Sequence, residues 1–163
     1  MLHHLFGAVT RVHAERTAPQ RGFDAEEGAA VVLRFAGGAV GTFVLADATP
    51  SPHNFEAGTG ENPAVPRAGR DVYRIFGARA ALSVPDMRRW SYDGREKSWT
   101  TELQEEVLPV PEDEPPFELQ MKHFVRVVRG LEEPSCSGAE GLRAVVVCDA
   151  IKRALEGGTI VDL

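Results

Sequence analysis

Alternation of apolar and polar residues predicts β-strands over much of the first half of the chain. Residues 8–16 alternate and contain β-branched side chains, which is typical of a strand. Residues 26–48 contain two apolar runs joined by Gly37-Gly38, a dipeptide that favours a two-residue hairpin turn because both central residues need positive φ. This turn predicts a register, with Phe35 opposite Val40, Leu33 opposite Thr42 and Val31 opposite Val44 on one face, and Val32 opposite Phe43 and Ala30 opposite Leu45 on the other.

In that register both faces of the hairpin are largely apolar, and only Arg34 and Asp47 stand out. An antiparallel ribbon with one solvated side should instead alternate apolar and polar residues. We therefore expect helices of this chain to cover one face. A partner subunit or a further domain is expected to cover the other, because an exposed apolar sheet face promotes aggregation.

The rest of the chain separates into strands and then helices. Three short strands are predicted in residues 70–94, with turns near Gly77 and Pro85-Asp86, and a fourth strand in residues 98–110. A proline-punctuated linker follows over residues 109–116. This segregation predicts an α+β fold, with a large, mostly antiparallel open-faced sheet and helices packed on one face.

Two helices are predicted after the linker. The first carries apolar residues at helical spacing and stops near Gly130; they are Phe117, Met121, Phe124, Val128 and Leu131. The second opens with a capping box, Ser137 and Glu140, and ends at Gly157-Gly158. Its expected buried face is formed by Ala144, Val147, Cys148, Ile151 and Leu155. Residues 159–163 are predicted to form an edge strand.

The chain starts as though inside a helix. Leu2, Leu5 and Phe6 share one helical stripe, and Gly7 stands where a helix would be capped. This start suggests a piece of a longer protein; the alternative is a short native N-terminal turn.

Residues 48–69 form a long polar stretch rich in proline and glycine between two strand regions. We expect it to lie over a polar ligand cleft, where its candidate ligand-binding residues are His53, Asn54, Glu56, Glu61 and Asn62. Polar groups of a ligand buried there would need such partners, since each unpaired polar group costs about 1–3 kcal/mol. The alternatives are a solvated loop or a contact with a neighbouring subunit.

Composition narrows the class of protein. The formal charge of −6 argues against a nucleic-acid partner, and no apolar run approaches the roughly 20 residues that a membrane helix needs. Two cysteines are too few for a disulfide framework, which favours a cytoplasmic protein with reduced thiols. With 163 residues, 43% of them apolar, the chain is expected to be one globular domain.

The sequence contains no complete catalytic motif. The segment Gly58–Pro63 begins like a dinucleotide fingerprint but has proline where the third glycine belongs. His53 and Glu56 have a metal-ligand spacing only on a helix, which the neighbouring prolines oppose, so we predict no metal site. Trp90 and Trp99 can stack on a sugar, but a core or interface role is the commoner one for tryptophan. These residues indicate a binding or assembly domain.

Several stretches, in order, resemble the C-terminal domain of the glucose–fructose oxidoreductase / inositol dehydrogenase (Gfo/Idh/MocA) family: residues 5–14, 28–48, 73–90, 123–130 and 137–161. The resemblance covers nearly the whole chain, residues 1–163. The resemblance implies that the chain is part of an NAD(P)-dependent oxidoreductase that acts on a sugar, an inositol or a related polyol. It also implies an N-terminal Rossmann domain in the full-length protein. It also implies that the open sheet face forms dimers or tetramers.

This sequence departs from the family pattern because the Rossmann domain, its lysine motif and an Asp/His pair are missing. We therefore assign no catalytic and no cofactor-binding residue here, and expect NAD or NADP only in the full-length protein. The chain is predicted to be the inactive substrate-binding and oligomerisation domain of such an oxidoreductase. The alternative is a stand-alone oligomerising or small-ligand-binding protein without catalysis.

Overall fold

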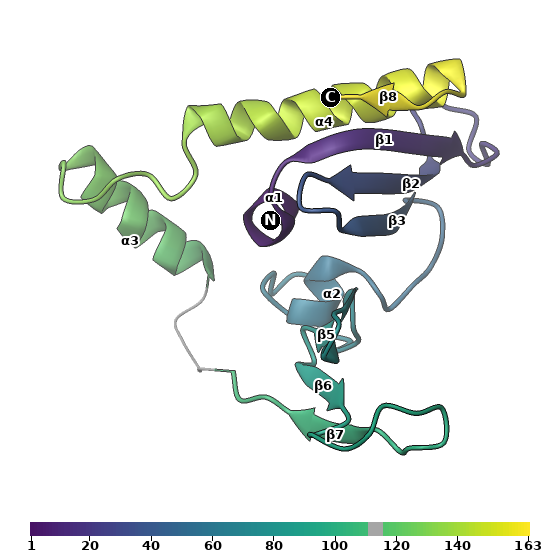
Figure 1. Cartoon of the computed structure of the whole chain (residues 1–163). Coiled ribbons are helices and arrows are strands. Elements are labelled where there is room, and N and C mark those ends of the chain that lie inside the picture. Colours follow the sequence, from purple (N-terminus) through teal and green to yellow (C-terminus); the bar gives the residue numbers. More distant parts are fainter. Residues whose placement is uncertain (111–115) are drawn as a thin grey trace. The chain divides into compact units, whose positions relative to one another are not determined.

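The computed structural model describes residues 1–110 and 116–163, which form two structural units (Figure 1). The first unit comprises Met1–Thr49 and Pro134–Leu163, and the second comprises Pro50–Glu133. Each unit is described by itself below. Most of the predicted proline-rich linker, residues 111–115, lies outside the described residues.

The first unit is a four-stranded antiparallel sheet with two helices. Its strand order is β3-β2-β1-β8. The elements are α1 (Leu2–Phe6), β1 (Val9–Arg16), β2 (Gly28–Phe35), β3 (Val40–Ala46), α4 (Gly138–Gly157) and β8 (Val161–Asp162). The predicted capping box at the start of α4 is present, and β8 is the edge strand expected at the end of the chain.

The hairpin between β2 and β3 forms, but its predicted register is wrong by one residue. Val31 lies opposite Phe43, and Ala30 lies opposite Val44. The loop has three residues instead of two: the backbone N–H of Gly38 donates to the carbonyl of Phe35, and the N–H of Phe35 donates to the carbonyl of Ala39. Gly38 alone has positive φ, at 88°. This is a turn followed by a left-handed bulge residue, which a Gly-Gly pair also permits.

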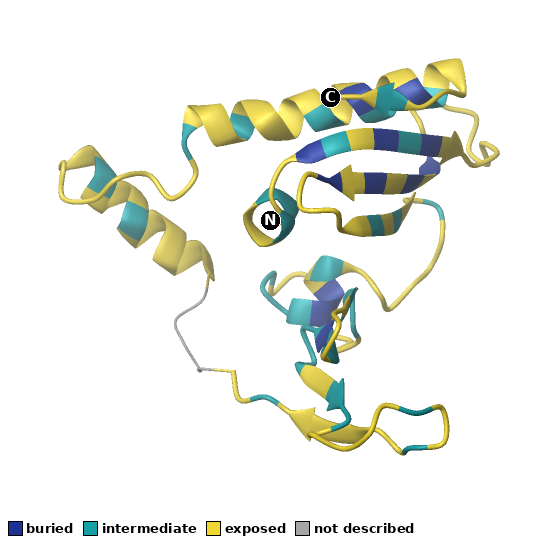
Figure 2. Ribbon diagram, viewed as in Figure 1, coloured by how far each residue is buried: buried dark blue, intermediate teal, exposed yellow. Residues whose placement is uncertain are grey.

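The core of the first unit lies between one face of the sheet and α4. Along β2 the buried residues alternate with exposed ones, and they are Ala29, Val31, Leu33 and Phe35 (Figure 2). Val12 and Ala14 of β1 continue this layer, because they pair with Leu33 and Val31. Ala150 and Ala154 of α4 are fully buried against it, so the helix approaches the sheet closely.

The buried face of α4 differs from the predicted one at two positions. Val147, Ile151 and Leu155 pack against the core as predicted, but Ala144 and Cys148 are exposed. The cause is that Ala150 and Ala154 face the sheet, which turns the helix so that Cys148 lies at the border of the packed stripe.

The opposite face of this sheet is uncovered within its unit. In the observed register, one row across this face is Glu15, Ala30 and Val44, and the next is His13, Val32 and Thr42. Val44 is 74% exposed. The face is thus apolar over β2 and β3 and polar along β1. The hairpin of β2 and β3 is thus largely apolar on both sides, as predicted, with Arg34 and Thr42 as polar positions of the open face.

The second unit contains a second four-stranded antiparallel sheet, of order β4-β5-β6-β7, and two helices. Its elements are α2 (Phe55–Thr59), β4 (Tyr73–Phe76), β5 (Ala80–Val84), β6 (Arg88–Ser91), β7 (Gln104–Val107) and α3 (Pro116–Val128). The strands and turns predicted in residues 70–94 are present. The α+β class is confirmed, with its antiparallel strands divided between two sheets.

Residues 48–69 contain one helical turn, α2, which the sequence analysis did not predict. Asn54 caps this helix, since its side chain accepts the N–H of Ala57. The carbonyl of Ala57 in turn accepts the N–H groups of Ala68 and Gly69. The stretch is therefore anchored by its own hydrogen bonds at both ends of the helix.

Gly58 allows α2 to lie directly on the chain that enters β4. A Cβ atom at this position would meet the carbonyl oxygen of Arg70 and a methyl group of Val72, both at 2.8 Å. Three residues earlier in α2, Phe55 forms an edge contact with Tyr73, with ring centroids 6.3 Å apart. Close backbone approach, which only glycine permits here, fixes α2 to the second sheet.

The helix α3 has the predicted length and apolar stripe, but the stripe is exposed. Phe117, Met121, Phe124 and Val128 are each more than half accessible to solvent. None of the helices in residues 1–110 and 116–163 combines the length and the apolar character needed to cross a membrane.

We predict that Gly58→Ala destabilises the second unit by about 1–3 kcal/mol, because backbone would have to move to admit the methyl group. Gly141→Ala in α4 is the matched control, since nothing lies within 4 Å of its Cβ position. That change should stabilise its helix by about 0.5–1 kcal/mol. Urea unfolding of both variants measures these effects. Equal stability of Gly58→Ala and wild type would contradict the packing of α2 described above.

Candidate functional site

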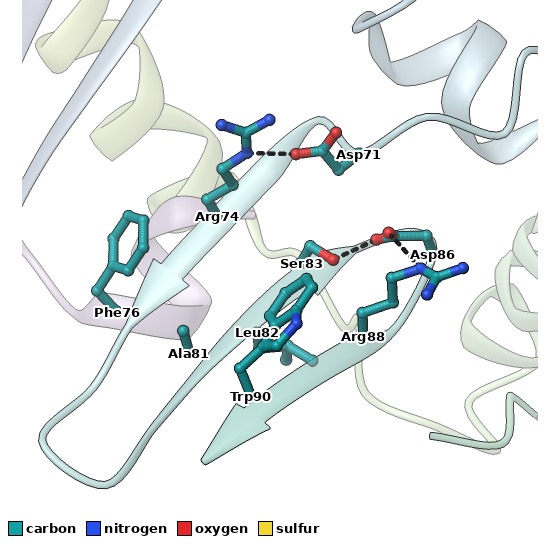
Figure 3. Close-up of a pocket in the computed structure, with 9 residues that line it drawn as sticks. All are labelled: Asp71, Arg74, Phe76, Ala81, Leu82, Ser83, Asp86, Arg88 and Trp90. Carbon is teal, nitrogen blue, oxygen red and sulfur yellow. Dashed lines mark hydrogen bonds and ion pairs between the residues drawn. The ribbon is translucent and has the colours of Figure 1, made fainter. Parts of the chain in front are cut away.

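A cavity of about 360 Å³ opens on one face of the second sheet (Figure 3). It is lined by the approach to β4, by β4, β5 and β6 and by the turn between β5 and β6, with the residues Asp71, Arg74, Phe76, Ala81, Leu82, Ser83, Asp86, Arg88 and Trp90. Strand alternation explains most of this set. Arg74 lies opposite Ser83, and Phe76 opposite Ala81, which pairs in turn with Trp90.

Two carboxylate–guanidinium pairs border the cavity. Nε of Arg74 donates to Asp71 at 2.5 Å. Nε of Arg88 lies 3.4 Å from Asp86, and another nitrogen of Arg88 contacts Glu105 on β7. The hydroxyl of Ser83, a buried residue, donates to Asp86 at 2.5 Å. The polar groups of the cavity are therefore fixed in place before any ligand binds.

Asp71 is a cavity carboxylate whose pKa is shifted from its ordinary value. The hydrogen bond and the charge of Arg74 hold the pKa of Asp71 below its ordinary value of 3.8, while burial of the carboxyl opposes this shift. The nearby ring of His53 also lowers it. Asp71 is thus ionised at neutral pH and acts as a hydrogen-bond acceptor, not as an acid.

Of the five candidate residues in residues 48–69, His53 lies nearest to this cavity. Its Nδ1 is 2.9 Å from the carbonyl oxygen and 3.3 Å from the carboxylate of Asp71, a lining residue. Asn54 has a local structural role as the cap of α2, and its amide also donates to the carbonyl of Ser51. Neither His53 nor Asn54 lines the cavity itself.

The other three candidates lie around the end of α2. The amide of Asn62 donates to Glu56 at 3.4 Å and accepts the N–H of Ala64. Glu61 is half-buried, and its backbone N–H donates to the hydroxyl of Thr59. The structure therefore brings Glu56 and Asn62 together, in a cluster separate from the contact between His53 and Asp71.

The cavity residues Asp71, Arg74, Asp86 and Arg88 were not selected from the sequence. The signal that identifies them is the pairing of the three short strands, since alternate residues of adjacent strands share a face. For Trp90 the sequence favoured a core or interface role over stacking on a sugar; in the structure it lines the cavity. Trp99, its companion in that prediction, is 105% exposed.

A second hollow, of about 470 Å³, lies in the first unit between α4 and the ends of β2 and β3. Its buried carboxylate, Glu27, accepts the backbone N–H groups of Gln20 at 2.6 Å and Arg21 at 2.8 Å. These hydrogen bonds, chiefly that of Gln20, lower the pKa of Glu27. Glu27 thus holds the connection between β1 and β2 in place, which gives it a structural role.

Across residues 1–110 and 116–163, no three histidine, cysteine, aspartate or glutamate side chains cluster as metal ligands do. His53 contacts Asp71, whereas Glu56 accepts a hydrogen bond from Asn62. The HxxE spacing therefore does not become a metal-ligand pair in this fold.

The family model for the oxidoreductase family C-terminal alpha/beta domain (Gfo/Idh/MocA) matches residues 1–163. The chain belongs to this family. The match confirms the resemblance inferred from the ordered sequence stretches. Among curated proteins, none matches the chain.

Solved structures similar to this Gfo/Idh/MocA C-terminal domain support the fold. One is the WlbA dehydrogenase from Bordetella pertussis in complex with NADH and UDP-GlcNAcA, with 21% identity and a TM-score of 0.63, covering 99% of this chain and 41% of that one. Another is an aldose-aldose oxidoreductase from Caulobacter crescentus complexed with glycerol, with 19% identity and a TM-score of 0.64, covering 96% and 42%. An NAD-binding protein from Listeria innocua has 13% identity and a TM-score of 0.70, covering 96% and 46%. The chain thus spans less than half the length of these structures.

The lowered pKa of Asp71 predicts how the stability of this Gfo/Idh/MocA domain depends on pH. The contribution of the ionised carboxylate is present above its ordinary pKa and is lost as the pH falls through the lower pKa of the folded state. Asp71→Asn should therefore lower stability slightly at pH 7, by less than about 1 kcal/mol for so exposed an arginine partner. It should also reduce the loss of stability on acidification.

Urea unfolding at pH 7 and pH 3 measures this difference. Asp93→Asn is the control, because Asp93 is exposed and forms no ion pair in the described part of the chain. Its φ of 49° also suits asparagine. An acid response of Asp71→Asn equal to that of Asp93→Asn would refute the role assigned to the Asp71–Arg74 pair.

Proposed function

We propose that this chain is the substrate-binding and oligomerisation domain of an NAD(P)-dependent oxidoreductase that acts on a sugar, an inositol or a related polyol. The observation that carries the proposal is the family match over residues 1–163. The similar structures that hold NADH with a nucleotide sugar, or glycerol, favour this cofactor and substrate class. The aromatic and carboxylate lining of the cavity offers suitable chemistry for hydroxyl groups.

The nicotinamide cofactor is assigned to an N-terminal Rossmann domain and not to these residues. Every strand pair in the described residues is antiparallel. Dinucleotide-binding units instead need parallel strands joined by a helix, with a glycine-rich turn at its start. We therefore assign no catalytic residue to this chain, and hydride transfer requires groups supplied by the cofactor domain.

Residues 48–69 are proposed to contact the substrate through His53, Asn54, Glu56, Glu61 and Asn62. His53 has the strongest support, since its ring already contacts a residue that lines the cavity. Asn54 and Asn62 have the weakest, because local hydrogen bonds use both ends of their amides.

The uncovered face of the first sheet is proposed to bind a second copy of the chain, in a dimer or a tetramer. Its apolar part, Val32, Val40 and Val44, is exposed. Along β1 the same face carries Arg11, His13 and Glu15, which provide polar contacts at the rim of an interface.

The two cysteines are free thiols, which agrees with a cytoplasmic location.

A charge in the apolar part of this face should dissociate the assembly. We predict that Val44→Lys converts the dimer or tetramer to a monomer, because a lysine opposite its own copy would be buried without a partner. Ala18→Lys is the matched control, since Ala18 is exposed but lies in the connection between β1 and β2, outside this face. Sedimentation velocity distinguishes the species. A wild-type chain that is monomeric at high concentration would refute the assembly.

The division of labour between domains predicts that the 163-residue chain alone binds neither NADH nor NADPH. Isothermal titration calorimetry should show no saturable heat with either cofactor. The same titration on a protein in which a Rossmann domain precedes these residues should show binding. Tight cofactor binding by the 163-residue chain would contradict the proposed division.

A further inference from the structure

The open face of the first sheet carries an arginine without an acidic partner. Arg34 of β2 is exposed and forms no ion pair within residues 1–110 and 116–163. Its neighbour across the strands is Arg11 of β1, whose Nε already donates to Asp162 at 2.7 Å. Any protein that covers this face must therefore supply an acidic group to Arg34, because a covered charge without a partner is strongly destabilising.

The acidic residue that remains on this face is Glu15, near the other end of β1. Its side chain is 72% exposed, and its ion-pair contact in the described part of the chain is with Nε2 of His13, at 3.5 Å. Glu15 lies opposite Ala30, four residues along β2 from Arg34. At about 3.4 Å per residue this separation is about 14 Å. That is longer than the Debye length of about 8–10 Å at physiological salt, so Glu15 does not neutralise Arg34 of its own chain.

These two charges make the face complementary to itself. They lie in the outer rows, on either side of a middle row formed by His13, Val32 and Thr42. A twofold axis that runs across the strands along the middle row exchanges the outer rows of two stacked copies. It places Arg34 of one copy over Glu15 of the second copy, and the symmetric pair forms as well, because a twofold interface repeats every contact.

Apolar residues also meet in this arrangement. Val32 faces its own copy across the axis, and the row of Val40 faces the row that contains Ala30 and Val44. The three valines are exposed in the single chain, so the contact removes apolar surface from water.

The other simple twofold arrangement is unfavourable. An axis along the strands would keep each row over its own copy. Arg34 would then face the row that contains Arg11 and Arg34 of the second copy, where like charges repel. Charge thus favours strands that run antiparallel between the two copies.

We propose that a second copy of this chain covers the open face with its strands antiparallel to those of the first, and that two ion pairs between Arg34 and Glu15 of opposite copies fix this register. The inference rests on the proposed function, which assigns the face to oligomerisation. It adds the residues by which the face recognises its own copy.

Charge reversal tests the pairing, with the dimer Kd measured by sedimentation equilibrium. Arg34→Glu and Glu15→Arg each place like charges together twice in the dimer. At about tenfold for each of the two pairs, either variant should raise Kd about hundredfold. The double variant with both changes restores opposite charges, and its Kd should return to within about tenfold of the wild-type value.

Arg79→Glu is the matched control, because Arg79 is an exposed arginine in the turn between β4 and β5 and has no ion pair in the described residues. It carries the same change of charge and should leave Kd unchanged. Arg34 and Glu15 are both exposed, so their reversal should leave the fold intact, which circular dichroism checks.

The outcomes separate this pairing from the proposed function. If the wild type associates and the single variants associate equally well, or the double variant stays as weak as they are, the pairing is wrong while the oligomerisation domain stands. If the wild type is monomeric at every concentration, both the pairing and the proposed oligomerisation are refuted.

Discussion

Successive side chains on a β-strand point to opposite faces, and this constraint positions both the core of the first unit and the cavity of the second. Along β2, every second residue from Ala29 to Phe35 is buried. Burial of Val or Leu side chains of this size contributes about 1.5–3 kcal/mol each. In the second sheet, the same alternation places Phe76, Ala81 and Trp90 in one row across three strands. A shift of one residue would move the core residues of the first sheet, or the cavity residues of the second, to the opposite face.

This dependence on strand register separates the features that the sequence predicts correctly from those that it does not. The strands, the two long helices and the capping box of α4 follow from local signals, and they are present. The hairpin register depends on whether Gly37-Gly38 makes a two-residue or a three-residue loop, and the dipeptide is compatible with both. The three-residue loop moves Val44 from the core side to the open face, where it is exposed. The open face carries Thr42 where Phe43 was predicted and is therefore less apolar than predicted, but its valines are exposed.

The candidate site was harder to predict because polar residues serve two purposes. Asn54 has suitable chemistry for binding a hydroxyl, yet in this fold its amide caps α2. Such capping needs the same side-chain oxygen that a ligand would use. Asp71 lies just before β4, and Asp86 lies in the turn between β5 and β6. The sequence alone gives no reason to select carboxylates at these positions as site residues. Their common location becomes visible only when the pairing of β4, β5 and β6 is known.

Part of the apolar surface of the described helices remains exposed to solvent. The stripe of α3 and the first half of α4, with Leu142 and Val145, are open to solvent in the described chain. Each fully exposed side chain of this kind forgoes about 25 cal/mol for every Å² that a partner could cover. Amphipathic helices persist with such faces because a further protein surface covers them. The exposed faces of α3 and α4 therefore offer apolar surface that a further protein surface could cover.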